Sequence, residues 1–237
     1  YTPKDVRDAV ASAFAHFASQ RPRPVYIEVP LDLLKEPAGE GWTPRALPKR
    51  PSPNAEQIAA AVAKLNGAKK PLILLGGGAL GAGKAAVEIA EKLKAPIITT
   101  TAGKGAVPTN HPLCLGQILA REGFWTLAAE SDAILCVGSE LSETDHWNDA
   151  MAIEKNLIRI DLDPAVMARP HTAEVAILGD AREALELIAK GVKDKKGKAE
   201  ASFDMGEPDA LRAMLTRVLE VIRKELPEDT VISSDMT

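Results

Sequence analysis

The sequence predicts an α/β fold in which a doubly wound, mostly parallel sheet carries helices on both faces. Short apolar runs alternate along the chain with amphipathic helical patterns, which is the arrangement of successive βαβ units. One run, residues 72–75, is apolar at every position and stops at Gly76, Gly77 and Gly78, and a helical pattern follows. A continuously apolar strand is typical of a parallel sheet buried on both faces, and crossovers between such strands are right-handed.

Composition limits the classes of partner. The 237-residue chain has 46% hydrophobic residues, enough for one large core, and a net charge of −4, which does not favour nucleic acid or a membrane surface. No apolar run has the length of a bilayer-spanning helix. Cys114 and Cys136 lie far apart, which fits a reducing cytoplasm and argues against a disulfide framework or a zinc site. We therefore expect a cytoplasmic protein without nucleic-acid or membrane partners.

The first part, residues 1–34, is expected to be the tail of a preceding domain. A helix that begins at Thr2 and Pro3 is indicated by a single apolar stripe, made by Val6, Ala9, Val10, Ala13, Phe14 and Phe17. Residues 25–29 have the composition of a strand, and Pro30 ends it. Five prolines then mark residues 35–53 as an extended linker.

The central domain is expected over residues 54–190. Its first helix is expected to be capped at Ser52 and Pro53 and to stop at Gly67. The expected strands cover residues 72–75, 96–100, 113–115, 133–137, 157–161 and 175–178. The further expected helices cover residues 83–93 and 123–129 and the stretch that begins at Ala181.

The last part is expected to be a linker followed by another domain. Residues 191–208 are polar and rich in lysine, which is typical of a solvated linker. Residues 209–237 are expected to start a further domain, with a helix over residues 211–222 and a strand over residues 231–235. Since the chain begins at Tyr1 and stops inside that expected strand, we expect it to be a piece of a longer polypeptide.

The glycine turn matches two phosphate-binding patterns incompletely. Gly76, Gly78 and Gly81 give the dinucleotide fingerprint, but residues 99–101 are threonines about where an acidic residue would bind the ribose, roughly 20 residues on. As a P-loop, the stretch has Ala85 where a hydroxyl would ligate magnesium. Two interpretations of Gly76, Gly77 and Gly78 stay open: a retained phosphate site, or glycines needed for packing alone.

Three aspartates are further candidates for binding a nucleotide cofactor. Asp161 and Asp163 end an expected strand, where open α/β sheets bind ligands, and both can accept hydrogen bonds from a ribose. The alternative is that Asp163 caps a short helix that begins at Pro164, and that Asp180 caps the helix from Ala181. We favour the capping interpretation for Asp163 and Asp180.

No catalytic or metal-binding set is found. None of His16, His111, His146 and His171 has metal-ligand spacing with a second histidine or cysteine. We interpret His146 as a surface-loop histidine and His111 as a residue that shapes a loop. No nucleophile lies beside a base, so we expect no complete active site in this chain.

The order of the pieces resembles the thiamine-diphosphate-dependent enzymes of the acetolactate synthase and 2-oxoacid decarboxylase family. The resemblance covers nearly the whole chain and is carried by residues 23–30, 71–78, 99–105, 110–112, 131–138, 160–164, 179–180 and 226–235. It implies that residues 54–190 form the family's Rossmann-like central domain, of the DHS-like nucleotide-binding type. It also implies that residues 1–34 end the pyrimidine-binding domain and that residues 209–237 start the diphosphate-binding domain.

The resemblance implies a parent enzyme that acts on a 2-oxo acid by decarboxylation or carboligation, with thiamine diphosphate and Mg²⁺. The activating glutamate would precede Tyr1 and the magnesium site would follow Thr237, so this fragment alone is expected to be inactive. Its partners would be the missing domains of the same chain, in a homodimer or homotetramer. Some family members bind FAD or ADP in the central domain, but residues 140–146 depart from the arginine-containing loop expected with flavin.

Two alternatives come from other functional classes. A stand-alone nucleotide-binding or assembly module would need only the sheet and the glycine turn. An NAD oxidoreductase domain would need the dinucleotide fingerprint in working form.

Overall fold

The structure is a computed structural model that describes residues 1–40, 42–146, 153–199, 201–204, 210–227 and 229–232. It divides into two compact units, Tyr1–Ser202 and Phe203–Thr237, which are described separately. Among the described residues, no helix combines the length and the apolar character needed to cross a lipid bilayer.

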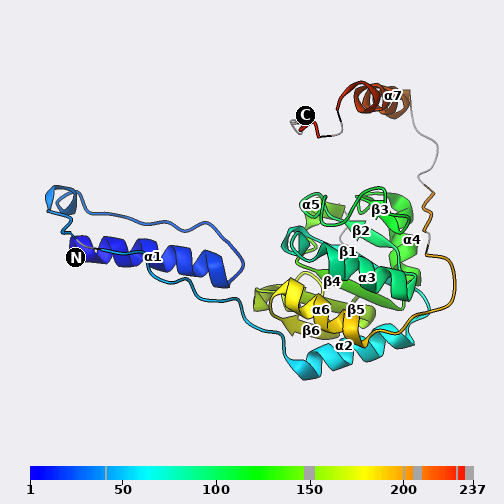
Figure 1. Cartoon of the computed structure of the whole chain (residues 1–237), viewed down its shortest axis with the longest axis horizontal. Coiled ribbons are helices and arrows are strands. Elements are labelled where there is room, and N and C mark those ends of the chain that lie inside the picture. Colours follow the sequence, from blue (N-terminus) through cyan, green and yellow to red (C-terminus); the bar gives the residue numbers. More distant parts are fainter. Residues whose placement is uncertain (41, 147–152, 200, 205–209, 228, 233–237) are drawn as a thin grey trace. The chain divides into compact units, whose positions relative to one another are not determined.

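The first unit contains a six-stranded sheet of order β3-β2-β1-β4-β5-β6, in which every pair of neighbouring strands is parallel (Figure 1). The strands are β1 (Pro71–Leu75), β2 (Ile97–Thr99), β3 (Cys114–Gly116), β4 (Ala133–Val137), β5 (Leu157–Asp161) and β6 (Val175–Leu178). The strand order reverses between β1 and β4, so the crevice between their carboxyl ends is the topological switch point. The predicted doubly wound α/β fold is confirmed.

Both faces of the sheet are buried, because successive side chains of a strand point to opposite faces. Ile73, Leu75 and Leu135 join a core with α2 (Ala55–Gly67), α3 (Gly83–Leu93) and α6 (Ala181–Gly191), which pack along one side of the sheet (Figure 1). The alternate residues of the same strands are buried outside that core, as are Phe124 and Ala128 of α4 (Glu122–Glu130). The short elements are η2 (Gly77–Ala79), α5 (Glu143–His146), η3 (Glu154–Asn156) and η4 (Pro164–Met167).

The ends of α2 differ from the prediction. Asn54, and not Ser52 with Pro53, is the N-cap, because its side-chain oxygen accepts hydrogen bonds from the backbone N–H groups of Glu56 and Gln57. Gly67 is the last helical residue and leaves the capping position to Ala68. An asparagine cap one residue beyond a proline is as plausible in the sequence as the serine, and only the backbone geometry separates them.

The segment before the central domain holds α1 (Pro3–Ser19) and η1 (Leu33–Lys35). Of the apolar stripe of α1, Ala13 is buried while Val10 and Phe14 are exposed. The strand predicted over residues 25–29 is wrong in this structure, since these residues belong to no strand and Tyr26 is exposed. A strand exists only through pairing, and these residues have no partner strand in the described part of the chain.

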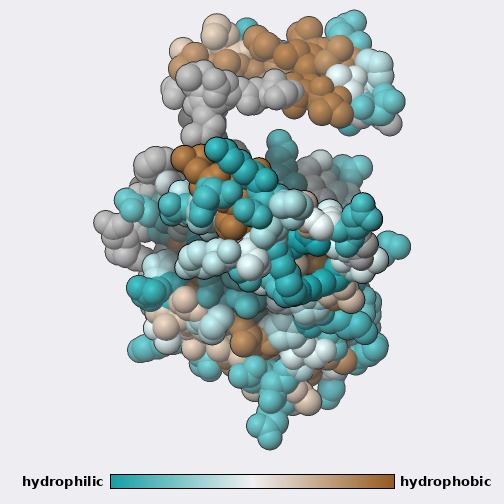
Figure 2. All heavy atoms as spheres, turned by 90° about the vertical axis from the view of Figure 1, so that its left-hand side faces the viewer, coloured by the Kyte–Doolittle hydropathy of each residue, from teal (hydrophilic) through white to brown (hydrophobic). Residues whose placement is uncertain are grey.

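The second unit contains α7 (Ala210–Glu225), in which no described residue is buried. Its apolar side chains are exposed and form a band along the helix (Figure 2), comprising Leu211, Met214, Leu215, Val218 and Leu219. The predicted helix is therefore confirmed. Of the strand predicted over residues 231–235, Val231 and Ile232 are not in a strand, and the other residues lie outside the described part of the chain.

Because the sheet is buried on both faces, truncating one of its side chains is expected to destabilise the fold strongly. Leu135→Ala, at a fully buried position of β4, is expected to lower the free energy of unfolding by about 2–5 kcal/mol, because it leaves a cavity between the sheet and its helices. Leu187→Ala on α6 is the control; that side chain is over a third exposed, so we expect a loss of roughly 1 kcal/mol or less. Urea unfolding of both variants measures the difference, and equal losses would contradict the assignment of this core.

Candidate functional site

The switch point is closed by two backbone turns that touch. A Cβ atom on Gly76 would lie 2.3 Å from the carbonyl oxygen of Gly138, and one on Gly78 would lie 2.8 Å from the Cα of Gly138. Gly138 itself has a φ of +60°, which favours glycine, and its own Cβ would lie 2.5 Å from the Cα of Gly78. Glycine is needed at these three positions because the turn after β1 packs directly on the turn after β4.

The N–H groups of the glycine turn are used inside the protein. Gly76 donates to the carbonyl of Val137 at 2.8 Å, Gly78 donates to Gly138 at 3.0 Å and Ala79 donates to Gly76 at 3.0 Å. A phosphate cradle needs N–H groups that point freely at the ligand. Of the two interpretations of this turn, the geometry therefore favours packing, and a cofactor-binding role for its glycines stays a prediction.

Gly77 lies at a cleft and has a looser contact than Gly76 or Gly78. It lines a cleft of about 400 Å³ at the carboxyl edge of the sheet, and a Cβ on it would lie 3.3 Å from the Cβ of Ala102. The cleft is rich in hydroxyl and charged groups, and its other lining residues are Arg21, Thr100, Thr101, Gly138, Ser139, Glu140, Ser142, Thr144 and Asp145.

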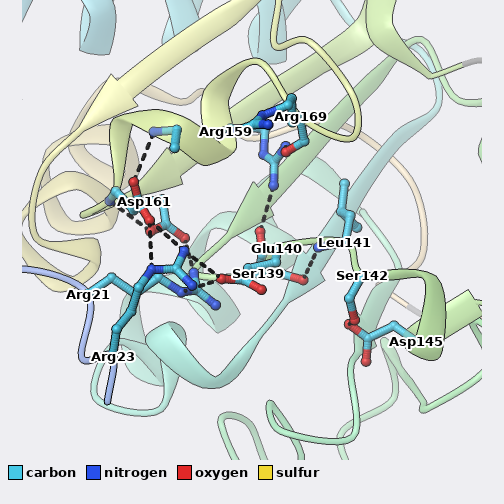
Figure 3. Close-up of polar contacts among 12 residues, drawn as sticks. Arg21, Arg23, Ser139, Glu140, Leu141, Ser142, Asp145, Arg159, Asp161 and Arg169 are labelled. Atoms are coloured by element: carbon cyan, nitrogen blue, oxygen red, sulfur yellow. Dashed lines mark hydrogen bonds and ion pairs between the residues drawn. The ribbon is translucent and has the colours of Figure 1, made fainter. Parts of the chain in front are cut away.

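Asp161 and Asp163 are both engaged at this edge (Figure 3). The buried carboxylate of Asp161 accepts from the guanidinium of Arg21 at 2.8 Å and from the N–H of Asp163 at 3.0 Å. Asp163 accepts from the N–H of Ala165 at 2.9 Å, so it caps η4 as the sequence favoured, and from Arg23 at 2.6 Å. The hydrogen bond from Arg23 holds the pKa of Asp163 below its usual range, although burial opposes this shift.

Glu140 joins the two arginines into one network. Its Oε1 lies 3.0 Å from the guanidinium nitrogens of both Arg21 and Arg23 (Figure 3). We call Arg21, Arg23, Glu140, Asp161 and Asp163 the edge cluster. Neither arginine was predicted as a site residue, and the signal that could have found them is their alternation with Pro22 and Pro24.

Asp180 lies in a different place from the edge cluster. It caps α6 by accepting from the N–H groups of Arg182 and Glu183, and it pairs with Arg50 at 3.0 Å. Burial favours a higher pKa for Asp180, but the Arg50 guanidinium and the two N–H donors outweigh it and lower the pKa. Asp180 lines a second cleft of about 260 Å³, with Arg50, Gly78, Gly81, Ala82 and Arg182. The structure therefore does not bring Asp161, Asp163 and Asp180 into one site.

Arg159 is a buried cation that the sequence analysis also passed over. It lies in the middle of β5, and its guanidinium donates to three carbonyl groups, those of Ser139 at 2.8 Å, His171 at 3.0 Å and Arg169 at 3.2 Å. These bonds fix the turn after β4 relative to the loop before β6. An arginine inside an otherwise apolar strand was the signal for such a role.

The histidines shape the structure around this edge. His146 is buried in α5, 3.2 Å from the carbonyl oxygen of Leu141, so its interpretation as a surface-loop residue was wrong. His111 accepts the N–H of Leu113 at 3.2 Å, which confirms that it shapes a loop. In the described ranges, no three His, Cys, Asp or Glu residues lie close enough to hold a metal ion.

Comparisons with known proteins agree with this geometry. The family model for the thiamine pyrophosphate enzyme central domain matches residues 58–188, and the chain belongs to this family. That match confirms the resemblance that the sequence analysis described.

Two curated relatives are named as a decarboxylase and as an acetolactate synthase subunit. The chain is 36% identical to the probable 2-ketoarginine decarboxylase of Pseudomonas aeruginosa, over 100% of this chain and 44% of that protein. It is 32% identical to the acetolactate synthase large subunit of Corynebacterium glutamicum, over 97% of this chain and 40% of that protein. The chain therefore spans less than half the length of these relatives.

Solved structures show the same fold. A Mycobacterium smegmatis protein described as a thiamin diphosphate-dependent enzyme superposes with a TM-score of 0.70 at 26% identity, over 84% of this chain and 40% of that one. Benzoylformate decarboxylase from Polynucleobacter necessarius superposes with a TM-score of 0.77 over 98% of this chain and 46% of that one. At 20% identity, the second likeness concerns the fold alone.

The two backbone turns predict different effects for neighbouring glycines. Gly76→Ala is expected to lower the free energy of unfolding by about 2–3 kcal/mol, because the new methyl group meets a backbone carbonyl that cannot move away cheaply. Gly77→Ala is the comparison and is expected to cost less than Gly76→Ala, because its methyl group would meet the Ala102 side chain at 3.3 Å and not a backbone carbonyl at 2.3 Å. Chemical denaturation measures both, and a larger loss for Gly77→Ala would contradict the packing interpretation of the turn.

The cap and the charge of Asp180 are separable. Asp180→Ala is expected to lower the free energy of unfolding by about 1 kcal/mol at neutral pH, because α6 loses its cap. Asp180→Asn keeps a capping oxygen, so we expect a smaller loss of stability. Since the pKa of Asp180 is lowered on folding, its charge stabilises the fold above about pH 4 and this contribution disappears as the pH falls further. The stability difference between wild type and Asp180→Asn should therefore shrink in acid, as followed by urea unfolding from neutral pH downward. A stability difference that grows as the pH falls would contradict a stabilising effect of the Asp180 charge.

Proposed function

We propose that the whole protein is a thiamine-diphosphate-dependent enzyme that acts on a 2-oxo acid, by decarboxylation or by acetolactate-synthase-like carboligation. The observation that carries this proposal is similarity along the full chain to a 2-ketoarginine decarboxylase and an acetolactate synthase, together with the family match. Since the chain spans less than half of those proteins, the catalytic groups are assigned to the rest of the polypeptide.

We propose the following division of the chain: the end of a pyrimidine-binding domain (residues 1–34), a linker (35–53), the central domain (54–190), a second linker (191–208) and the start of a diphosphate-binding domain (209–237). The exposed apolar side chains of α1 and α7 support it, because an amphipathic helix needs a partner for its apolar face. The missing domains of the same polypeptide are the proposed partners, within a homodimer or homotetramer.

Thiamine diphosphate, with Mg²⁺, is the proposed cofactor of the whole enzyme and supplies the electron sink for a carbanion when bound. The described residues of this chain hold the domain architecture and do not touch that chemistry. Cys114 and Cys136 are free thiols, which supports a cytoplasmic location. The occupied N–H groups of the glycine turn argue against the alternative of an NAD oxidoreductase.

The test uses the full-length protein with thiamine diphosphate and Mg²⁺. We expect CO₂ release from at least one member of a panel of 2-oxo acids that includes pyruvate and 2-ketoarginine, and loss of that release when EDTA removes the metal. Assay of acetolactate separates carboligation from simple decarboxylation. The 237-residue chain alone is the matched control and should release no CO₂. Absence of turnover by the full-length protein across the panel would contradict the proposal.

A further inference from the structure

Two arginines from the segment after α1 meet two aspartates at the end of β5 in matching order. Arg21 pairs with Asp161 at 2.8 Å (Figure 3). Arg23 pairs with Asp163 at 2.6 Å. One residue separates the two arginines in sequence, and one residue separates the two aspartates. Glu140 contacts both arginines. The contact is therefore built from two segments 140 residues apart in sequence.

The sequence favours this spacing locally. A residue that precedes proline is confined to extended conformations, and both Arg21 and Arg23 precede a proline. In an extended chain, residues two apart point to the same side and lie roughly 6.5–7 Å apart. Asp161 ends a strand and Asp163 has extended angles of φ −107° and ψ 114°, so the carboxylates have a comparable spacing. The arginine pair is thus held in register with the aspartate pair before any contact forms.

Burial makes the Arg21–Asp161 pair, here called the inner pair, stronger than the Arg23–Asp163 pair. The side chain of Asp161 is 4% exposed and that of Arg21 is 25% exposed, so the carboxylate would be a costly buried charge without its partner. Arg23 is half exposed, so its pair with Asp163 contributes less. Arg21 therefore supplies most of the attachment and Arg23 supplies the register.

Asp161 and Asp163 are also carboxylates at a strand end, where a nucleotide ribose could donate hydrogen bonds to them. Doubly wound sheets bind a dinucleotide at the switch point, with a strand-end carboxylate on the ribose hydroxyls and free N–H groups on the phosphates. Here arginines from the same chain hold both carboxylates, and the glycine turn donates its N–H groups to the protein. The residues present do not fit FAD or ADP, which the fold would otherwise suggest.

We infer that Arg21 and Arg23 form a clamp that fastens the segment after α1 to the carboxyl edge of the central sheet and takes the place of a nucleotide ribose there. The clamp replaces a ligand with a part of the chain, and it couples the central domain to the segment that precedes it. The inference rests on the contacts of the edge cluster and does not require the proposed 2-oxo acid chemistry.

A double-mutant cycle on the full-length protein tests the attachment. Arg21→Met, Asp161→Asn and the double variant are compared by urea unfolding, with Lys4→Met and Asp8→Asn as the matched cycle on an exposed ion pair of α1. We expect the inner pair to show a coupling of about tenfold or more in the unfolding equilibrium constant, and the control pair roughly fivefold or less. Additive effects of Arg21→Met and Asp161→Asn would overturn the clamp.

A second measurement covers the case in which Arg21→Met does not fold. The cycle of Arg23→Met with Asp163→Asn takes its place, because this pair is more exposed and asparagine keeps the cap of η4. We expect its coupling to exceed that of the Lys4–Asp8 control, and a coupling no larger than the control would overturn the clamp.

The occupancy of the edge is tested on the unmodified full-length protein. We expect titration with ADP to give no binding heat and the purified protein to show no visible flavin absorption. Stoichiometric binding of ADP or FAD would overturn the inference that the clamp occupies the ribose position. Turnover of 2-oxo acids is not a readout in any arm, so failure of the proposed activity and failure of the clamp remain distinguishable.

Discussion

The contact between two backbone turns at the switch point is the constraint on which the rest of this structure depends. The turn after β1 and the turn after β4 approach until no Cβ fits at Gly76, Gly78 or Gly138. The N–H groups of Gly76 and Gly78 then donate to the carbonyl groups of Val137 and Gly138, so these two donors are used within the protein, and the cleft that remains at this edge is lined by Gly77. Glycines in a fingerprint-like spacing thus support the packing of the fold at this edge, as their close backbone contacts require.

Charged side chains at the same edge are also partnered by other parts of the chain. Asp161 sits in β5, where burial requires a cationic partner, and Arg21 supplies it from outside the central domain. Arg159 lies two residues before Asp161 in β5. Its guanidinium donates to three carbonyl groups and connects the turn after β4 to the loop before β6. Each charged group at the edge is therefore neutralised or hydrogen-bonded by the chain itself, which leaves the edge as an interface between segments.

The parts of this arrangement that sequence could predict are local ones. Apolar runs placed all six strands, and residue type with position placed the caps at Asp163 and Asp180, because strand burial and helix capping depend on neighbours within a few residues. The errors concern distant partners. Residues 25–29 have strand composition but no strand to pair with among the described residues, and His146 follows a strand like a loop residue yet is buried. Arg21 and Asp161 are 140 residues apart, a separation that no local pattern records.

These features show how contacts within the chain can hold the central domain together at the switch point. A ligand at the switch point would hold the two halves of the sheet together and would order the loops above it. In this chain, the glycine packing holds the two halves of the sheet together. Arg21 and Arg23, which precede the central domain in sequence, order the loops at its edge. Since the attachment is intramolecular, it needs no ligand concentration and acts through the effective concentration of a tethered segment. The central domain can then position the segments on either side of it whether or not any nucleotide is present.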